Sequence, residues 1–243
     1  MSQNVIDVKD LVITYKTVQR SSLFHFLQPR RKKKKESLFT AVKGVSFSIE
    51  EGQIVGIVGK NGSGKSTMLR SIAGVFSPNS GSIDIHGRSI SLLSIGVGFE
   101  RTLSGRENIY LSGLLLGFTK EQIQEQEEAI IAFSELGDFI DKPVSTYSSG
   151  MYSKLAFSIT AILETDIMLI DEVLSVGDVK FKKKSYDKMK ELIQNDTRTV
   201  LIVSHSSETI RSLCDKVLWL HEGELKMFGD TDEVMKAYEA FMK

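Results

Sequence analysis

Hydrophobic residues along this chain repeat either every second position or at helical spacing. Residues 4–16 alternate apolar and polar side chains, which predicts a strand with one buried face. The runs QIVGIV (53–58), DIMLID (166–171) and TVLIVS (199–204) are almost continuously apolar, which is typical of strands buried on both faces of a parallel sheet. Further strands are predicted within 38–50, at 82–86 and in a hairpin over 216–229 that turns at Glu222-Gly223.

Helices are predicted between these strands. They are expected at 65–74, within 105–136, from YSSGM (147–151) onward, at 178–195, up to Cys214 and at 231–242. Thr119 and Gln122 form a capping box that begins the second helix of the 105–136 segment. Strands that alternate with helices predict an α/β core with a parallel sheet.

The order of these elements predicts one domain over residues 1–243 with an insertion of helices. We expect a core at about 1–93 and 166–230, an N-terminal antiparallel β subdomain, a helical subdomain at about 100–165 and a C-terminal helix at 231–243. Residues 20–37 interrupt the pattern after the first strand with an aromatic cluster, a proline and the basic run Arg30–Lys35, which predicts an insertion or surface loop.

Composition excludes several classes of protein. The 31 basic and 31 acidic residues cancel, so no overall charge favours nucleic acid as a partner. A single cysteine, Cys214, forbids an intrachain disulfide and fits a reducing compartment. The polar N-terminal residues do not form a signal peptide, and no apolar run approaches the roughly 18 residues of a membrane span. We therefore expect a soluble or peripheral protein.

The most specific chemical signal is GIVGKNGSGKST (56–67), which contains G-x-x-x-x-G-K-S between a predicted strand and a predicted helix. Its glycines allow the backbone to turn successive N–H groups inward around phosphates. Lys65 would reach the β- and γ-phosphates, Ser66 would ligate Mg²⁺, and Thr67 would lie near the α-phosphate. The candidate phosphate-binding residues are Gly59, Lys60, Asn61, Gly62, Ser63, Gly64, Lys65, Ser66 and Thr67.

Two more strand ends present chemically useful side chains. Asp171 and Glu172 follow a buried apolar run, where Asp171 would hold Mg²⁺ through water and Glu172 would orient and deprotonate an attacking water. A surface acidic pair fits poorly after such a run. His205 follows the next buried strand and would contact the γ-phosphate, although a structural histidine is the alternative.

A second candidate anion site opens the helix after Tyr147. Ser148, Ser149 and Gly150 expose backbone N–H groups at the positive end of the helix dipole. The simpler interpretation is a serine-capped helix with no ligand. The sequence pattern leaves both interpretations open.

With these motifs in order, the chain resembles an ATP-binding-cassette (ABC) ATPase along nearly its whole length. Residues 59–67 match the Walker A motif of that family, 167–171 its Walker B, Glu172 its catalytic glutamate and His205 its switch histidine. The resemblance also implies that Tyr15 packs against adenine, that 175–178 is the D-loop with Asp178 as its acid, and that 147–151 is the signature motif. No glutamine lies between Arg88 and Asn108, where the family carries its Q-loop; Ser94 and Glu100 are the alternatives, and neither is assigned.

The residues that occupy several of these motifs resemble those of one branch of the family, which exports lipid-linked polysaccharides. YSSGM, EVLSVGD (172–178) and GRENI (105–109) are shared features of that branch, and FSELGDFIDKPV (133–144) is most similar to ATPase subunits of teichoic acid exporters. O-antigen exporters often append a carbohydrate-binding domain, for which a chain of 243 residues leaves no room. An O-antigen or capsular polysaccharide exporter is the alternative.

The resemblance implies a mechanism and partners. Two copies would enclose two ATP molecules with Mg²⁺, each held by the Walker A loop of one copy and by Ser148, Ser149 and Gly150 of the other. The homodimer would act on a separate transmembrane permease, present as two copies, which moves an undecaprenyl-diphosphate-linked polymer. The chain would then lie peripherally on the cytoplasmic face of the cell membrane. A soluble ABC ATPase of translation or repair is the less favoured alternative, because the chain shows neither a second cassette nor a long coiled coil.

The sequence leaves the role of two surface features open. The run Arg30–Lys35 could lie on anionic lipid, contact the diphosphate of the polymer, or form a solvated loop. Leu114, Leu115 and Leu116 could dock the permease or belong to the core of the helical subdomain.

Overall fold

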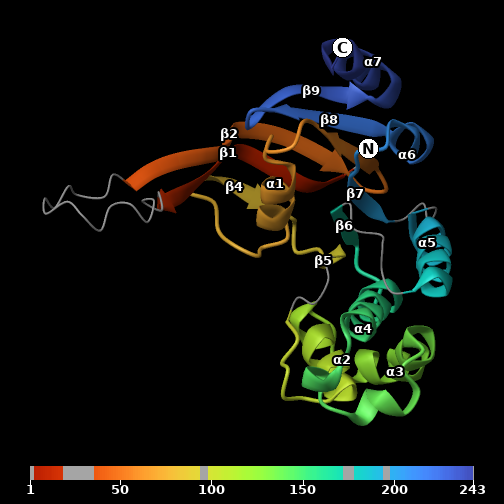
Figure 1. Cartoon of the computed structure of the whole chain (residues 1–243). Coiled ribbons are helices and arrows are strands. Elements are labelled where there is room, and N and C mark those ends of the chain that lie inside the picture. The colour runs from red at the N-terminus through yellow and green to blue at the C-terminus, as the bar shows by residue number, and fades with distance from the viewer. Residues whose placement is uncertain (1–2, 19–35, 94–97, 172–177, 194–197, 243) are drawn as a thin grey trace, which may run out of the picture.

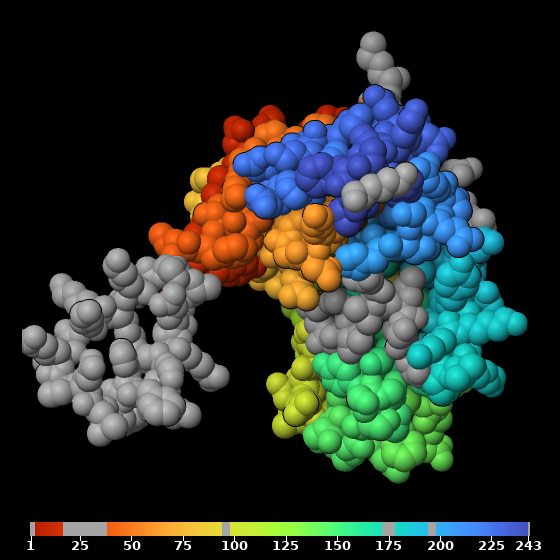
Figure 2. All heavy atoms as spheres, turned by 45° about the horizontal axis from the view of Figure 1, so that its top comes forward, coloured from red at the N-terminus to blue at the C-terminus, as the bar shows by residue number. Residues whose placement is uncertain are grey.

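The computed structural model describes residues 3–18, 36–93, 98–171, 178–193 and 198–242. Figure 1 shows two sheets packed in one body, and helices α2, α3 and α4 gathered beneath them in that view. The space-filling view shows the same division, with the helical region (green) projecting from a body that contains the first strands (red) and the last helix (dark blue) (Figure 2). Glu172, residues 175–177 and the run Arg30–Lys35 lie outside the described residues.

The larger sheet has six strands in the order β5-β6-β7-β3-β8-β9. The neighbours from β5 to β8 pair in parallel, and β9 returns antiparallel to β8. Ile57, Val203 and Asp171 lie level with one another in the register of β3, β7 and β6, so the three strands end at one edge. The strands are β3 (Ile54–Val58), β5 (Ile90–Leu93), β6 (Ile167–Asp171), β7 (Thr199–Val203), β8 (Lys216–His221) and β9 (Glu224–Asp230).

A second, antiparallel sheet has the order β2-β1-β4, formed by β1 (Asn4–Val18), β2 (Glu36–Glu50) and β4 (Ser80–Asp84). β1 and β2 pair from Asn4↔Glu50 to Val18↔Glu36, and Tyr15 lies opposite Phe39. The alternation seen in the sequence is realised in two segments: Ile6 and Val8 are buried in the first and Leu11 and Ile13 in the second, and the register with β2 shifts between them. The expected α/β fold with an N-terminal antiparallel sheet is confirmed.

The antiparallel sheet and α1 cover one face of the larger sheet, and helices cover the other. One apolar cluster fills the space between the two sheets and α1 (Lys65–Ile72), and Met68 and Leu69 are fully buried in it. On the other face, α5 (Val179–Ile193), α6 (Ser207–Leu213) and α7 (Thr231–Met242) pack over a second cluster that contains Phe181. The end of α7 lies against β8, where Phe241 contacts Trp219 and His221.

The helical region contains α2 (Gly105–Leu115), α3 (Lys120–Ser134) and α4 (Ser149–Ile162), packed on a third cluster that includes Ile109, Ile123, Ile130 and Leu155. The predicted capping box of Thr119 and Gln122 is confirmed, and a second box with Ser104 as N-cap begins α2. Two short 3₁₀ helices, Gly137–Asp141 and Val144–Thr146, join α3 to α4.

Strand β5 is the element that sequence reasoning missed. It is only four residues long, and its buried Ser91 interrupts the apolar run. The Ser91 hydroxyl lies 2.8 Å from the Thr165 hydroxyl, so a hydrogen bond satisfies it inside the core. The pairing with β6, and not the local sequence, makes this segment a strand.

Candidate functional site

The loop between β3 and α1 can be built only with glycine at two positions. A Cβ on Gly59 would lie 2.2 Å from the Leu220 carbonyl oxygen, and one on Gly64 would lie 2.4 Å from the Ala41 carbonyl oxygen. Both residues have positive φ, 151° and 103° respectively, where L side chains are strained. The loop is thus pressed against β2 and β8, and its backbone curls around the start of α1.

Lys65 occupies the centre of that curl. The residue is 6% exposed, and its ammonium group donates hydrogen bonds to the carbonyls of Gly59 at 2.7 Å and Lys60 at 3.1 Å. A buried ammonium is costly unless hydrogen bonds satisfy it, and these carbonyls supply two of its partners. The loop therefore holds a fixed positive charge at the point where phosphates would enter.

Ser66 and Asp171 form the metal side of the site. The Ser66 hydroxyl donates to Asp171 Oδ1 at 2.8 Å, although the two residues are 105 positions apart. Arg70 lies 3.9 Å from the other carboxylate oxygen. An adjoining hydroxyl and carboxylate suit Mg²⁺, which prefers oxygen ligands and takes one or two from protein beside those of phosphates and water. Among the described residues no cluster of three His, Cys, Asp or Glu side chains could hold a metal ion by itself.

Lys65 and Ser66 open onto a cavity of about 240 Å³, whose lining includes neither Asp171 nor Gly59. Tyr15 is 41% exposed at its edge, and its hydroxyl donates to Thr67 Oγ1 at 3.5 Å. His205, an exposed residue two positions after the end of β7, also lines it. The complete lining is Tyr15, Phe39, Ala41, Asn61, Gly62, Gly64, Lys65, Ser66, Thr67, Val203 and His205.

Phe39 is a site residue that sequence reasoning missed. It lies opposite Tyr15 in the β1–β2 register and is 52% exposed, so two aromatic rings flank the cavity mouth. Its position depends on the register of β1 with β2, which the sequence pattern does not give. Rings at such a mouth can stack on a flat, aromatic ligand group.

Lys60 and Ser63 belong to the loop but do not line the cavity. The Lys60 ammonium lies 5.6 Å from the centre of the Phe241 ring on α7. Ser63 is 3% exposed, its carbonyl accepts from Gly223 N–H at 3.1 Å, and its buried hydroxyl has no hydrogen-bond partner within the described structure. Both residues thus contact the C-terminal part of the chain, and their role in binding phosphate stays a prediction.

The second predicted anion site is a helix start of its own. Ser148 is the N-cap of α4, and its hydroxyl accepts from Met151 N–H at 3.2 Å, so the capped helix is confirmed. A Cβ on Gly150 would meet only the Ser148 hydroxyl, at 3.8 Å, which leaves this turn open to an approaching group. Ser148, Ser149 and Gly150 are not among the residues that line the cavity, and α4 lies with α2 and α3, away from α1 (Figure 1).

Asp178 immediately precedes α5. Its Oδ1 accepts from Phe181 N–H at 3.0 Å, and its Oδ2 lies 2.6 Å from the Lys154 ammonium on α4. The hydrogen bond from Lys154 lowers the pKa of this carboxyl to about 2, so it is ionised throughout the neutral range. Asp178, too, is absent from the cavity lining, as are the residues of the helix start at α4.

A family model described as "ABC transporter" matches residues 42–175. The chain is 42% identical to the O-antigen export system ATP-binding protein RfbB of Myxococcus xanthus, over 98% of this chain and 56% of the relative. It is 49% identical to the teichoic acids export ATP-binding protein TagH of Bacillus anthracis, over 84% and 37% respectively. It thus spans less than two thirds of both, but 90% of the RfbB protein of Klebsiella pneumoniae, to which it is 40% identical.

Solved structures share the fold at lower sequence identity. The structure of an ATP-binding subunit of an ABC transporter matches 97% of this chain with a TM-score of 0.73 and 22% identity. The dimeric ATP-binding cassette MJ0796, in a post-hydrolysis state bound to ADP and Pi, matches 93% with a TM-score of 0.69 and 22% identity. The expected P-loop core with a parallel sheet is therefore confirmed as a fold.

The loop geometry yields a test with Mg²⁺-ATP as the probe. Changing Gly59 to Ala should lower ATP affinity about 5- to 150-fold, because the loop must move away from the Leu220 carbonyl, a strain of roughly 1–3 kcal/mol. Isothermal titration calorimetry measures the dissociation constant for Mg²⁺-ATP. Gly87→Ala is the matched control, because Gly87 also has positive φ, 70°, but nothing lies within 4 Å of an added Cβ. Equal affinities of the two variants would contradict this account of the loop.

Proposed function

This chain belongs to the ABC transporter family, and from that membership we propose that it is the ATP-hydrolysing subunit of an exporter for a lipid-linked surface polymer. The observation that carries the proposal is the pairing of a phosphate loop and its metal side chains at one strand edge with a separate, open helix start outside the cavity. The relatives named for O-antigen export and for teichoic acids export support the class of cargo.

Within that class we assign the chain to teichoic acid export. The identity to TagH of Bacillus anthracis, 49%, exceeds the 42% to RfbB of Myxococcus xanthus, although it extends over fewer residues, 203 against 245. An O-antigen or capsular polymer is the second candidate, which the coverage of the RfbB relatives favours. The cargo would be an undecaprenyl-diphosphate-linked polymer.

The chemical step follows from the side chains at the strand edge. When ATP enters, Lys65 would exchange its two loop carbonyls for β- and γ-phosphate oxygens, and N–H groups of the loop would bind the same phosphates. Ser66 and Asp171 would hold Mg²⁺, which neutralises charge that develops on the phosphates. Glu172, which directly follows Asp171 in sequence, would accept the proton of the attacking water, and His205 would contact the γ-phosphate.

One copy of the chain has only part of this site. Ser148, Ser149 and Gly150 offer N–H groups at the start of α4, which favours an anion, but they lie outside the chain's own phosphate cavity. In a homodimer they would face the γ-phosphate bound by the partner's loop. Hydrolysis would remove that phosphate and so release the two copies, which makes the dimer a switch governed by the nucleotide.

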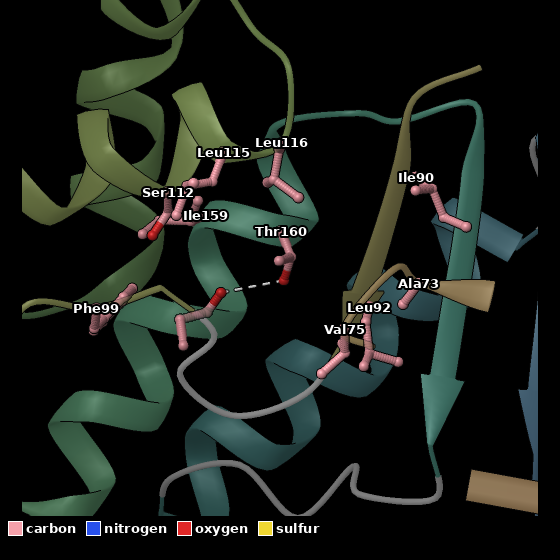
Figure 3. Close-up of a pocket in the computed structure, with 11 residues that line it drawn as sticks. Ala73, Val75, Ile90, Leu92, Phe99, Ser112, Leu115, Leu116, Ile159 and Thr160 are labelled. Atoms are coloured by element: carbon pink, nitrogen blue, oxygen red, sulfur yellow. Dashed lines mark hydrogen bonds between the residues drawn. The ribbon is translucent and has the colours of Figure 1, made fainter. Parts of the chain in front are cut away.

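The membrane partner would dock between the helical region and the sheet. A cavity of about 170 Å³ lies there, lined by apolar residues of α2, α4 and β5, among them Leu115, Ile159 and Leu92 (Figure 3). Ser112 is 6% exposed, and its hydroxyl has no partner in the part of the chain that the structure describes, so it can bind a polar group of an incoming helix. Leu115 is 65% exposed at the rim.

This arrangement would place the chain peripherally on the cytoplasmic face of the membrane. None of the helices in the described part of the chain is both long and apolar enough for a bilayer crossing. The permease would therefore carry the polymer across, and this chain would supply the free energy of ATP hydrolysis. The run Arg30–Lys35, which lies outside the described residues, stays a candidate for contact with anionic lipid.

Dimerisation and turnover can be separated with two substitutions. Glu172→Gln should lower kcat by about 10²- to 10³-fold and trap an ATP-bound dimer in size-exclusion chromatography, because the general base is lost while both phosphate sites remain. Adding Ser148→Arg should abolish the dimer but spare ATP binding to the monomer.

Thr119→Arg is the control for Ser148→Arg, because Thr119 also caps a helix through its hydroxyl but lies on α3. It should leave the trapped dimer intact. Hydrolysis by Glu172→Gln at the wild-type rate would show that another residue acts as base.

Docking of the permease in this cavity predicts that substitutions of two neighbouring leucines affect permease binding to different extents. Leu115→Asp should weaken co-purification with the permease at least about tenfold, since it places a charge at the rim of an apolar contact. Leu114→Asp is the matched control, because Leu114 is 55% exposed but does not line the cavity. Both variants should keep the ATPase rate of the free chain. Equal loss of the permease with both would contradict docking in this cavity.

The cargo is tested with the chain and its permease in proteoliposomes. Undecaprenyl-diphosphate-linked teichoic acid should stimulate the ATPase rate severalfold, whereas a lipid-linked O-antigen should leave it near the basal value. The reverse order would assign the chain to the second candidate. Stimulation by neither polymer would contradict both assignments.

A further inference from the structure

Two helices of the helical region and one helix that covers the larger sheet meet at a cluster of phenylalanines. Phe133 of α3, Phe157 of α4 and Phe181 of α5 contact one another with ring centres 5.8 to 6.1 Å apart. Phe157 is 4% exposed and Phe181 is fully buried. This cluster joins the helical region to a helix that covers the larger sheet.

A row of alternating charges covers the cluster. The Lys154 side chain on α4 is only 14% exposed, and its ammonium lies 2.6 Å from Asp178 Oδ2 and 3.9 Å from Glu135 Oε2. It also lies 5.1 Å from the centre of the Phe181 ring. Glu135 in turn accepts from Lys184 on α5 at 3.1 Å.

The two acids in this row sit at helix ends. Glu135 ends α3 in a left-handed conformation, with φ 56°, so its carboxylate projects from the last turn. Asp178 caps the first turn of α5 through Phe181 N–H while it pairs with Lys154. Lys184 closes the row by donating to the Phe133 carbonyl at 3.0 Å. Each of the two acids therefore links the end of its own helix to a lysine on a neighbouring helix.

Apolar packing and ion pairs have different effects where α4 contacts α5, a contact that we call the joint. Burial of the three rings favours contact but is not directional, so it leaves α4 able to rotate or slide on α5. The Lys154 side chain is 14% exposed and that of Asp178 is 59% exposed, so their ion pair is partly screened by solvent, but its short contact is directional and is lost if either helix shifts. The Lys154–Asp178 pair therefore selects one position of α4 against the start of α5.

Lys154 lies six residues after Ser148 on α4, or about 9 Å along the helix axis. We propose that Lys154 is a positioning residue, which holds the Ser148 end of α4 and the Asp178 end of α5 as one unit that a chain presents to its partner copy. The proposal rests on the proposed function, because the unit acts only where two copies enclose ATP. It assigns a role to a residue outside the phosphate cavity.

The experiment compares Lys154→Met with Lys154→Arg and Asp178→Asn. Lys154→Met and Asp178→Asn should each lower kcat about tenfold or more, since a small displacement of a reacting constellation has effects of this size. The dissociation constant for ATP on the monomer should change less than about twofold, because neither residue lines the cavity. The double variant should be no slower than either single variant, and Lys154→Arg should restore most of the rate.

Lys188→Met is the matched control. Lys188 lies on α5, its side chain is 18% exposed, and its ammonium lies 2.7 Å from Glu191. The Lys188→Met variant therefore loses a comparable ion pair that does not link α4 to α5. It should leave kcat unchanged. Unchanged kcat in Lys154→Met, additive effects of Lys154→Met and Asp178→Asn, or a parallel loss of ATP affinity would overturn the positioning role.

Hydrogen exchange of backbone amides separates this inference from the proposed function. In Lys154→Met, exchange should accelerate together at residues 149–153 and 179–182, and Lys154→Arg should reverse it. A wild-type chain that binds ATP but never hydrolyses it would contradict the proposed function, and the exchange data would still decide whether the joint exists. Exchange equal to wild type in both segments would overturn the joint.

Discussion

The parallel pairing of β6, β7 and β3 is the constraint on which the rest of the site depends. Their register brings Ile57, Val203 and Asp171 level, so the loop after β3 and the acid that ends β6 reach the same edge. The hydrogen bond between Ser66 and Asp171 then spans 105 positions of sequence without any special connection. Almost every residue of β3, β6 and β7 is buried, because the antiparallel sheet and α1 cover one face of the larger sheet and helices cover the other. A shift of one residue in any of these strands would separate hydroxyl from carboxylate.

Sequence reasoning predicted those parts of the molecule whose information is local. Continuous apolar runs identified β3, β6 and β7, and the glycine spacing of residues 59–64 identified a loop that only glycine can build at two positions. Capping residues placed the starts of α3 and α4 correctly. Each of these signals lies within a few residues of the feature that it determines.

What could not be predicted depends on contacts between distant segments. Ser91 reads as a break in a strand, and only its hydrogen bond to Thr165 shows how β5 tolerates it. Phe39 lies at the cavity mouth because it pairs with Tyr15 across β1 and β2. This register cannot be derived from the local sequence. The pairing of Lys154 with Asp178 has no periodic signature, since the two residues lie on different helices that meet only in the folded chain.

The hydrogen bonds of Lys65 have a consequence for how long a nucleotide stays bound. Because its ammonium is already satisfied by two loop carbonyls, phosphate binding yields only the difference between new and surrendered contacts. The same carbonyls are there to receive the ammonium when a product departs, so dissociation does not have to leave a bare buried charge. The loop thereby limits affinity and shortens product residence, which suits a protein that must empty its site in every cycle.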